Sequence, residues 1–585
     1  MRRIIVGLVA AIAVMGCNPG EPTTDAGVDA GVDAGTQPEV CVTLLPERFP
    51  VSTTLAGGCY LAQKTPVISA GVTLTMQPGV KIVFSRDVDF SISADQVLLA
   101  QGTAEHPIVF TALLPERGFW KGLGFEGTST PSRLDWVIVE YGGNTTADRD
   151  AAGIKLSADS RGVRVGLTHT IVRHSQGWGL SASGSSVFPQ FEANTFTLNT
   201  LGPAALDAPV VGVLDAASGF AGNTRDELVV YGMSLTDSAT WKAIDVPYYV
   251  SKRIALSTAD LTLQPGVTLH MADGSGFEVP EGSTLNAAGT AEKPIVMTGV
   301  TKTRGAWKGL VFGSNDARNV LDHVTIEWAG DITSDWTGSA VKVIADSRGA
   351  QLRMANTRLT DSEGFGLYLS ASAILTDFNG NVLTRNGSGP AYVGSETVHQ
   401  LLPTSTYAGN DLDRVQVGAN WVNDSVTWNA LDVPYRLDGK LRPQKVLTIA
   451  PGTTIELTEQ SAISVAGTDD VAGLHAVGTA ALPITFTGVT KTAGFWDGIT
   501  FDGDNNPANA LDHCIVEYGG GATRLGWKGM IFSHSDSHGV TVSVTNSTVR
   551  YSATYGIWFN SGQTGSVSGN TYSNNAQGDY FREQP

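Results

Sequence analysis

Short apolar runs broken by Gly, Asn and Asp follow one another along most of the chain. Examples are PIVFT at 107–111, VIVEY at 137–141 and GIKLS at 153–157. Runs of about five residues with frequent turns are typical of β-strands. No window places apolar residues at i, i+3, i+4 and i+7 for long enough to predict a substantial helix. The pattern therefore predicts an all-β protein.

A much longer period divides the chain into homologous units. One motif recurs as GTAEHPIVFT from Gly102, GTAEKPIVMT from Gly289 and GTAALPITFT from Gly478. A second recurs as LDWVIVEYGG from Leu134, LDHVTIEWAG from Leu321 and LDHCIVEYGG from Leu511. The first two copies are 187 residues apart and the next two are 186 to 190 apart. Repeats of supersecondary units at a fixed period indicate a solenoid or an array.

Within each unit we count about seven coils of roughly 27 residues, with Asn at the bends. Asn suits such bends because it tolerates the left-handed region and its amide can bond the backbone. The recurring PGV, GTAExPIxFT, GxWxGI and LxxVxIEYxG signatures resemble the right-handed parallel β-helix of the pectin-lyase-like superfamily, over residues 55–585. The resemblance implies an all-β, right-handed parallel β-helix (β-solenoid) of about nineteen coils in three homologous super-repeats.

The N-terminus carries an export signal. MRRIIVGLVAAIAVMGC has two Arg, then an apolar run too short for an ordinary transmembrane helix, then Gly16-Cys17. Val14 to Cys17 resembles a bacterial lipobox, which implies removal of residues 1–16 and lipid attachment at Cys17. Residues 17–40, rich in Asp, Ala and Gly, are expected to form a disordered tether, and they resemble the spacers of myxobacterial surface lipoproteins. We expect export and anchoring to the bacterial outer membrane, with exposure at the cell surface.

The rest of the chain divides into a cap and three units. The expected parts are an N-terminal cap at 41–60 and β-helix units at 61–250, 251–437 and 438–585, the last truncated. Cys41 and Cys59 are expected to form a disulfide in an oxidising compartment, and Cys514 is interpreted as a core residue. A solenoid edge left bare invites aggregation, so we expect the GDYFREQP tail to cover the last coil.

The charge of the chain limits its partners. The net charge is −18, from 38 basic and 56 acidic residues. Such a surface repels nucleic acid and anionic headgroups, so we expect no nucleic-acid partner. An acidic polysaccharide stays open, because a local basic groove can exist on an acidic protein.

Three aligned tryptophans, Trp120, Trp307 and Trp496, are candidate binding residues. Seven coils at about 4.8 Å each separate them by roughly 34 Å, so they cannot share one pocket. The charged position that follows is Lys121, Lys308 and then Asp497. Because the sign changes, we favour aromatic packing and turn formation over ligand binding for this motif.

Paired carboxylates recur in every unit, as Asp135 with Glu140 in the first. Five residues apart on a strand, they point to different sides, so one acid–base site is not expected. We expect the Asp to hold a turn and the Glu to pair with the neighbouring coil, with Val137, Val139 and Tyr141 pointing inward.

The best candidates for catalysis form a charged cluster in the first unit: Asp148, Asp150, Lys155, Arg161 and Arg164. Asp502 and Asp504 are candidate Ca²⁺ ligands in a loop, although the spacing beyond them does not fit an EF-hand. No other cofactor is expected.

The function expected from the sequence is a structural or binding scaffold for polysaccharide or a cell-surface protein, tethered to a lipid bilayer. The alternative is a polysaccharide lyase or glycoside hydrolase with a single site on one unit. A cluster confined to one unit would favour the enzyme, and similar faces in all three would favour the scaffold.

Overall fold

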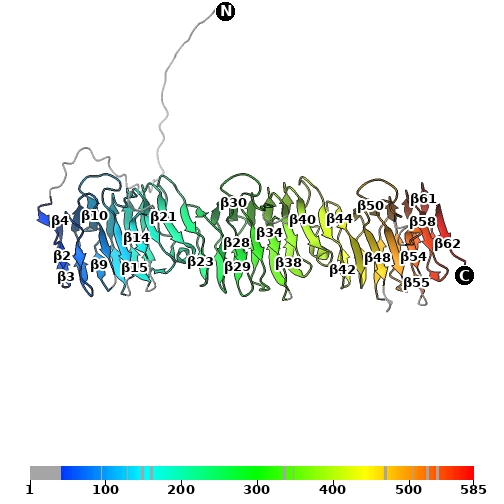
Figure 1. Cartoon of the computed structure of the whole chain (residues 1–585), viewed down its shortest axis with the longest axis horizontal. Coiled ribbons are helices and arrows are strands. Elements are labelled where there is room, and N and C mark those ends of the chain that lie inside the picture. The colour runs from blue at the N-terminus through cyan, green and yellow to red at the C-terminus, as the bar shows by residue number, and fades with distance from the viewer. Residues whose placement is uncertain are drawn as a thin grey trace, which may run out of the picture. The chain divides into compact units, whose positions relative to one another are not determined.

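Short parallel strands make up nearly all of the regular secondary structure (Figure 1). This computed structural model describes residues 41–584 except 94, 128–129, 146–150, 158–161, 334–337, 347, 467–470, 503–504, 522–525 and 535–538. The described helices are two short 3₁₀ turns, η1 (Ala208–Val213) and η2 (Val398–Gln400). The chain is thus a parallel β-helix, as the sequence predicted.

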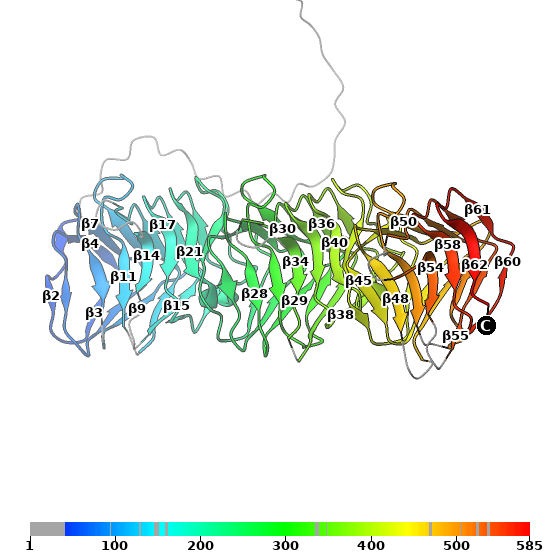
Figure 2. The ribbon, with the colours of Figure 1, turned by 45° about the vertical axis from the view of Figure 1, so that its right-hand side comes forward.

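Each coil of the first unit supplies one strand to each of three sheets. The coil from Ile108 contains β10 (Ile108–Ala112), β11 (Leu123–Glu126) and β12 (Ser132–Asp135), and the next strand, β13 (Val137–Glu140), pairs in parallel with β10. Figure 2 shows successive coils stacked side by side along the long axis. Every coil can therefore present three outer faces.

Three of the sheets together hold about half of the strands, and they show how the units are related. The first holds β1 (Thr43–Leu44), β4 (Gly58–Ala62), β7 (Val80–Phe84), β10, β13, β16 (Ile171–Arg173) and β20 (Thr195–Thr197). A twelve-stranded sheet runs through β8 (Phe90–Ile92), β11, β14 (Ala152–Ser157), β17 (Trp178–Ala182), β21 (Gly202–Asp207), β22 (Leu228–Tyr231), β24 (Tyr248–Val250), β27 (Thr268–Met271), β30 (Ile295–Gly299), β33 (Val324–Glu327), β36 (Arg358–Thr360) and β39 (Val382–Thr384). A thirteen-stranded sheet runs through β25 (Ile254–Ala255), β28 (Phe277–Val279), β31 (Leu310–Phe312), β34 (Ser339–Val343), β37 (Phe365–Leu369), β40 (Gly389–Gly394), β41 (Val415–Gly418), β44 (Tyr435–Asp438), β47 (Thr454–Leu457), β50 (Ile484–Gly488), β53 (Cys514–Glu517), β57 (Thr548–Arg550) and β61 (Thr571–Ser573).

Strands that are equivalent by sequence lie in different sheets. The GTAxxPIxFT motif forms β10, β30 and β50, which belong to the first, twelve-stranded and thirteen-stranded sheets respectively. The twelve-stranded sheet instead joins β11 of the first unit to β30 of the second, seven strand steps apart. Equivalent strands of the first two units are therefore separated by about seven coils and lie on neighbouring faces of the β-helix. This corresponds to a rise of roughly 34 Å along the axis and a rotation from one face to the next.

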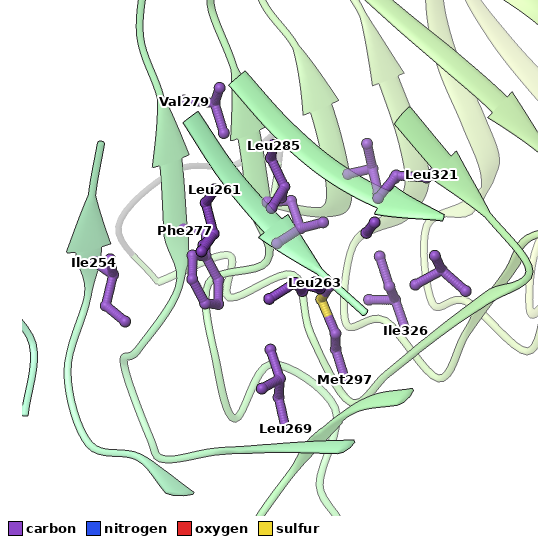
Figure 3. Packing of buried hydrophobic residues seen from close by; sticks show 14 of the residues in the cluster. Ile254, Leu261, Leu263, Leu269, Phe277, Val279, Leu285, Met297, Leu321 and Ile326 are labelled. Carbon is purple, nitrogen blue, oxygen red and sulfur yellow. The ribbon is translucent and has the colours of Figure 1, made fainter. Parts of the chain in front are cut away.

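Ladders of apolar side chains fill the interior. Leu269, Met297 and Ile326 lie opposite one another on β27, β30 and β33, and all three are fully buried (Figure 3). Phe125 and its equivalents Phe312 and Phe501 are also fully buried. The core is therefore continuous from coil to coil, and burial of this apolar surface is its main source of stability.

Asn residues hold the bends, one in the same place in each unit; the first two are fully buried and the third is half-buried. Asn199, Asn386 and Asn575 each accept a hydrogen bond from a backbone N–H of the preceding coil, at 3.0–3.1 Å. Each also donates through Nδ2 to a carbonyl oxygen of that coil, at 3.1–3.2 Å. The predicted amide–backbone bonding is confirmed at these bends.

The left-handed conformation expected of Asn occurs at other asparagines, with φ of 48° at Asn356 and Asn546 and 56° at Asn574. None of the three Asn that bond the preceding coil has positive φ, whereas Trp136 and Tyr141 do, at 52° and 62°. The prediction that Tyr141 points inward is wrong, because the corner after Glu140 breaks the strand alternation. Its ring is half-buried and stacks on His174 of the next coil at 5.0 Å.

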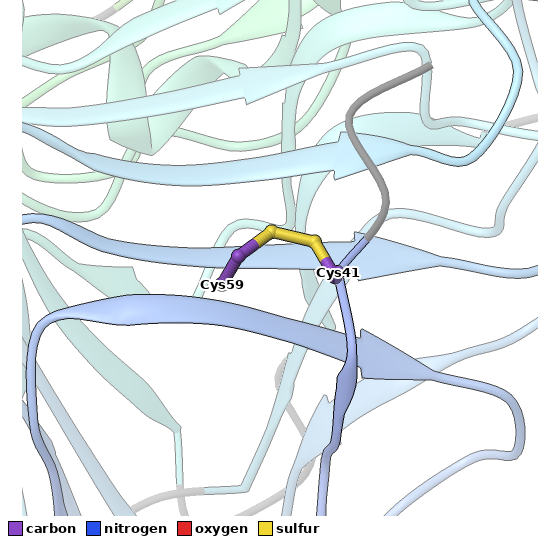
Figure 4. The surroundings of a disulfide bond; sticks show 2 residues. All are labelled: Cys41 and Cys59. Carbon is purple, nitrogen blue, oxygen red and sulfur yellow. A yellow bond between two sulfur atoms is a disulfide. The ribbon is translucent and has the colours of Figure 1, made fainter.

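The two ends of the described stack differ from simple caps. Cys41 and Cys59 form a disulfide with Cα atoms 5.2 Å apart (Figure 4). The segment expected as a cap already contributes strands, including β2 (Arg48–Phe49) and β3 (Thr53–Leu55). At the other end Gly578–Arg582 forms β62, the last strand of a seven-stranded sheet, so the expectation that this tail covers the edge is wrong. Within the described residues no helix is long and apolar enough to cross a membrane.

Candidate functional site

The three aligned tryptophans are core residues. Trp120, Trp307 and Trp496 are each 0 % exposed. Their Nε1 atoms donate to the backbone oxygens of the equivalent Glu residues at 2.8–2.9 Å. A ring without exposed surface cannot stack on a ligand, which corrects their choice as binding candidates.

The glycine in the same motif allows neighbouring coils to approach. Gly122, Gly309 and Gly498 have φ of 101°, 93° and 135°. A Cβ at these positions would lie 2.3–2.5 Å from a backbone oxygen of the next coil. The motif is therefore structural, as the sequence favoured.

The recurring Glu side chains pair with the neighbouring coil, as predicted. Glu140 accepts from Arg173 Nε at 2.9 Å, and Glu517 accepts from Arg550 Nε at 2.7 Å. Each also accepts from a Thr hydroxyl of the preceding coil, at 2.8 and 2.9 Å. These carboxylates stabilise the stack and leave no need for a catalytic role.

The recurring Asp side chains hold the corners. Asp512 accepts from Thr545 Oγ1 at 2.6 Å and from Asn546 Nδ2 at 2.9 Å, and His513 Nδ1 lies 2.8 Å away. Partial burial by itself raises the pKa of Asp512, but these hydrogen bonds outweigh it, so the pKa lies below its usual value. The ionised form is the one that the fold requires.

The charged cluster of the first unit is only partly described. Asp148, Asp150 and Arg161 lie outside the described residues, as do Cys17 and Asp504. Lys155 lies on β14 and Arg164 on β15 (Val163–Thr168), and these strands belong to different sheets. A corner of the coil therefore separates the two described members, and the structure does not bring them to one face.

Lys155 instead borders a shallow cleft on the outside of β8, β11 and β14. Gly124 lies between Ser91 and Lys155 on neighbouring strands, and its missing side chain leaves the hollow. Asp89, Lys121 and Glu126 also line the cleft, whose volume is about 170 Å³. This volume is below the roughly 300–1,000 Å³ of typical ligand pockets.

Asp502 has a different partner from the one expected. It is exposed at the end of β51 (Gly498–Asp502), and His534 Nδ1 lies 3.2 Å from its Oδ1. Within the described residues no group of three His, Cys, Asp or Glu side chains is arranged to hold a metal ion.

A second cleft lies beside Asp502 and His534, with Trp527 on its wall. Trp527 stands in GWKGMIF, which repeats part of the motif that surrounds the three aligned tryptophans. It lies outside the register of the three aligned copies, in the loop before β54 (Gly529–His534). That displaced position was the signal that its ring differs from the buried three.

Comparison with known families supports the fold. A family model described as pectate-lyase like beta helix domain matches residues 234–344, which span the junction of the first two units. No curated protein matches the chain. The chain is therefore similar to a pectate-lyase-like β-helix over this segment.

Proposed function

We propose that the protein is a surface-anchored β-helix lipoprotein that serves as a structural or binding scaffold for polysaccharide or a cell-surface partner. The signal at 1–16, the lipobox ending in Cys17 and the tether at 17–40 support export and attachment to the outer membrane. The tether would hold the folded stack away from the lipid surface.

One observation carries the scaffold role: the units repeat their inner residues and vary their outer ones. On the second face of the coil, the inner positions are Phe125, Phe312 and Phe501, all fully buried. The outward-pointing position on the next strand is Lys155, Lys342 and then Phe532; Lys155 is half-buried, whereas Lys342 and Phe532 are 6 % and 4 % exposed. A constant core whose outward-pointing side chains differ from unit to unit suits a scaffold better than one catalytic centre.

The alternative is a polysaccharide lyase or glycoside hydrolase. The cleft of the first unit favours it, because Asp89, Glu126 and Lys155 line one hollow and supply both acidic and basic groups.

A binding and cleavage assay separates the two functions. The full chain, purified in detergent, is incubated with acidic and neutral polysaccharides and with intact bacterial cells, with and without Ca²⁺. Retention without new chain ends is the expected result for the scaffold. New unsaturated or reducing ends that disappear in Lys155→Ala would establish the enzyme instead. No retention on any polymer or cell would contradict the scaffold.

A further inference from the structure

Outward-pointing positions of the last unit carry a ladder of stacked aromatic rings, of which Phe532 and Trp558 are buried and Phe581 is exposed. Phe532, Trp558 and Phe581 lie opposite one another on β54, β58 (Tyr555–Phe559) and β62. Their ring centroids are 5.3 and 5.9 Å apart. The same ladder positions are occupied by Lys155, Ser181 and Ala205 in the first unit, and by Lys342, Tyr368 and Tyr392 in the second.

Two small side chains precede this ladder and leave a hollow in front of it. Ser464 on β48 (Ala462–Ala466) lies opposite Thr500 on β51, and Thr500 lies opposite Phe532. The resulting cleft has a volume of about 380 Å³ and is also lined by Lys440, Asp502, Trp527 and His534. Unlike the cleft of the first unit, it lies within the usual size range of ligand pockets.

The floor of the cleft holds two hydroxyl groups without partners. Thr500 is 3 % exposed and Ser464 is 8 % exposed. Among the residues that the structure describes, neither hydroxyl has a hydrogen-bond partner, and both residues line the cleft. Because both hydroxyls line the cleft and their hydrogen-bonding capacity is unused within the protein, they can bond a ligand that enters.

The wall of the cleft offers an aromatic surface next to polar groups. The half-buried Trp527 ring lies 6.4 Å from Phe532, and Lys440 Nζ lies 5.2 Å from the Trp527 centroid. Asp502 and His534, 3.2 Å apart, lie on adjacent strands at the rim. An apolar ring face surrounded by donors and acceptors matches a sugar ring, which has apolar C–H faces and hydroxyl groups around its edge.

We propose that this cleft binds a neutral pyranose unit of a polysaccharide chain. The sugar ring stacks on Trp527, and its hydroxyls bond Thr500, Ser464 and the Asp502–His534 pair. The ligand is neutral because the charge of Lys440 is opposed by the nearby charges of Asp497 and Asp502, and because the net charge of −18 opposes a polyanion. This site deepens the proposed binding function, on which it rests.

Two variants and one matched control test the site. Trp527→Ala removes the stacking surface, and Thr500→Val removes a hydroxyl at nearly constant shape. Trp136→Ala removes another half-buried tryptophan, at a corner of the first unit. Circular dichroism and thermal unfolding establish that each variant is folded.

Binding of each full-chain protein is measured by affinity electrophoresis and tryptophan fluorescence against a β-glucan, a galactan, a mannan and polygalacturonate. We expect at least one neutral polymer to bind the parent protein. Hot-spot aromatics typically account for tenfold or more in affinity, so Trp527→Ala should bind about tenfold or more weakly. Thr500→Val should bind several-fold more weakly, and Trp136→Ala should match the parent.

The outcomes that overturn this site differ from those that overturn the scaffold. Binding of neutral polymer that Trp527→Ala and Thr500→Val leave unchanged would remove the site and keep the scaffold. Binding of polygalacturonate alone would show that the ligand is acidic, which contradicts the proposal. If neither polymers nor cells retain the parent protein, the scaffold function itself fails.

Discussion

Replacing one buried Asn should loosen one bend of the β-helix without disturbing the rest. Asn386 is fully buried, and its Oδ1 accepts from Ser362 N–H at 3.0 Å while its Nδ2 donates to Leu359 O at 3.2 Å. Asn386→Leu keeps the approximate volume but removes both of these hydrogen bonds, together with a third from Nδ2 to Asn410 Oδ1 at 3.0 Å. The Ser362 N–H stays buried and loses its acceptor.

The structure gives the size of this effect. A buried donor without an acceptor costs about 1–3 kcal/mol, and the lost bond to Leu359 O costs about 1 kcal/mol more. The sum, about 2–4 kcal/mol, corresponds to an opening equilibrium about 30- to 1,000-fold more favourable, since tenfold equals about 1.4 kcal/mol. A solenoid is coupled mainly between neighbouring coils, so the change should remain near residues 359–388.

Hydrogen–deuterium exchange measured by mass spectrometry detects this local opening directly. It is preferred to global unfolding, because so long a repeat protein does not unfold in a two-state transition. Peptides that cover 359–388 should exchange faster in Asn386→Leu, and peptides from the first unit should not. Asn420→Leu is the matched control, because Asn420 is exposed. Equal exchange in the two variants would refute the role assigned to the buried amide.

Three further outcomes follow from the same structure. Gly309→Ala should lower the thermal unfolding temperature more than Gly274→Ala. Both glycines have positive φ, but only a Cβ at position 309 would meet a backbone oxygen, at 2.5 Å. Equal shifts of the unfolding temperature would contradict the close approach of the two coils at Gly309. Reducing the Cys41–Cys59 disulfide should destabilise the first coil by up to about 3 kcal/mol, seen as faster exchange in 43–62 and unchanged exchange in the last unit. The folded pKa of Asp512 is lowered, so its stabilisation is present above the unfolded pKa of about 3.9 and is lost as pH falls through the folded value; Asp512→Asn should flatten this acid dependence of local exchange.

The sequence predicted the fold and the role of most inner positions, because these depend on periodicity and on local chemistry. The packing role of Trp120 follows from the recurrence of its motif, and the coil-to-coil pairing of Glu140 follows from strand alternation. The Cys41–Cys59 disulfide was suggested by the exported context and by a spacing of 18 residues.

What the sequence could not predict depends on where the chain turns a corner. Tyr141 follows such a corner, so the alternation that placed Val139 inside fails two residues later. Lys155 and Arg164 are close in sequence but lie on different faces, because a corner falls between them. The sequence also does not show the rotation about the long axis between one unit and the next. A period of 187 residues gives the length of a unit, but it does not show whether the unit ends on a complete coil.

That rotation has a consequence for how a polymer can bind. The ladder that carries Phe532 in the third unit belongs to a different sheet from the ladder that carries Lys342 in the second. A straight chain along one side of the stack therefore meets non-equivalent positions in successive units, and avidity through three identical sites is not available to it. We expect calorimetry with a short neutral oligosaccharide to give one site per protein, lost in Trp527→Ala and unchanged in Tyr368→Ala. A stoichiometry of three would mean that the outward-pointing ladders of all three units bind alike in spite of their different side chains. That result would contradict the assignment of the binding site to the cleft of the third unit. It would also contradict the inference that the units share their inner residues but differ in their outward-pointing ones.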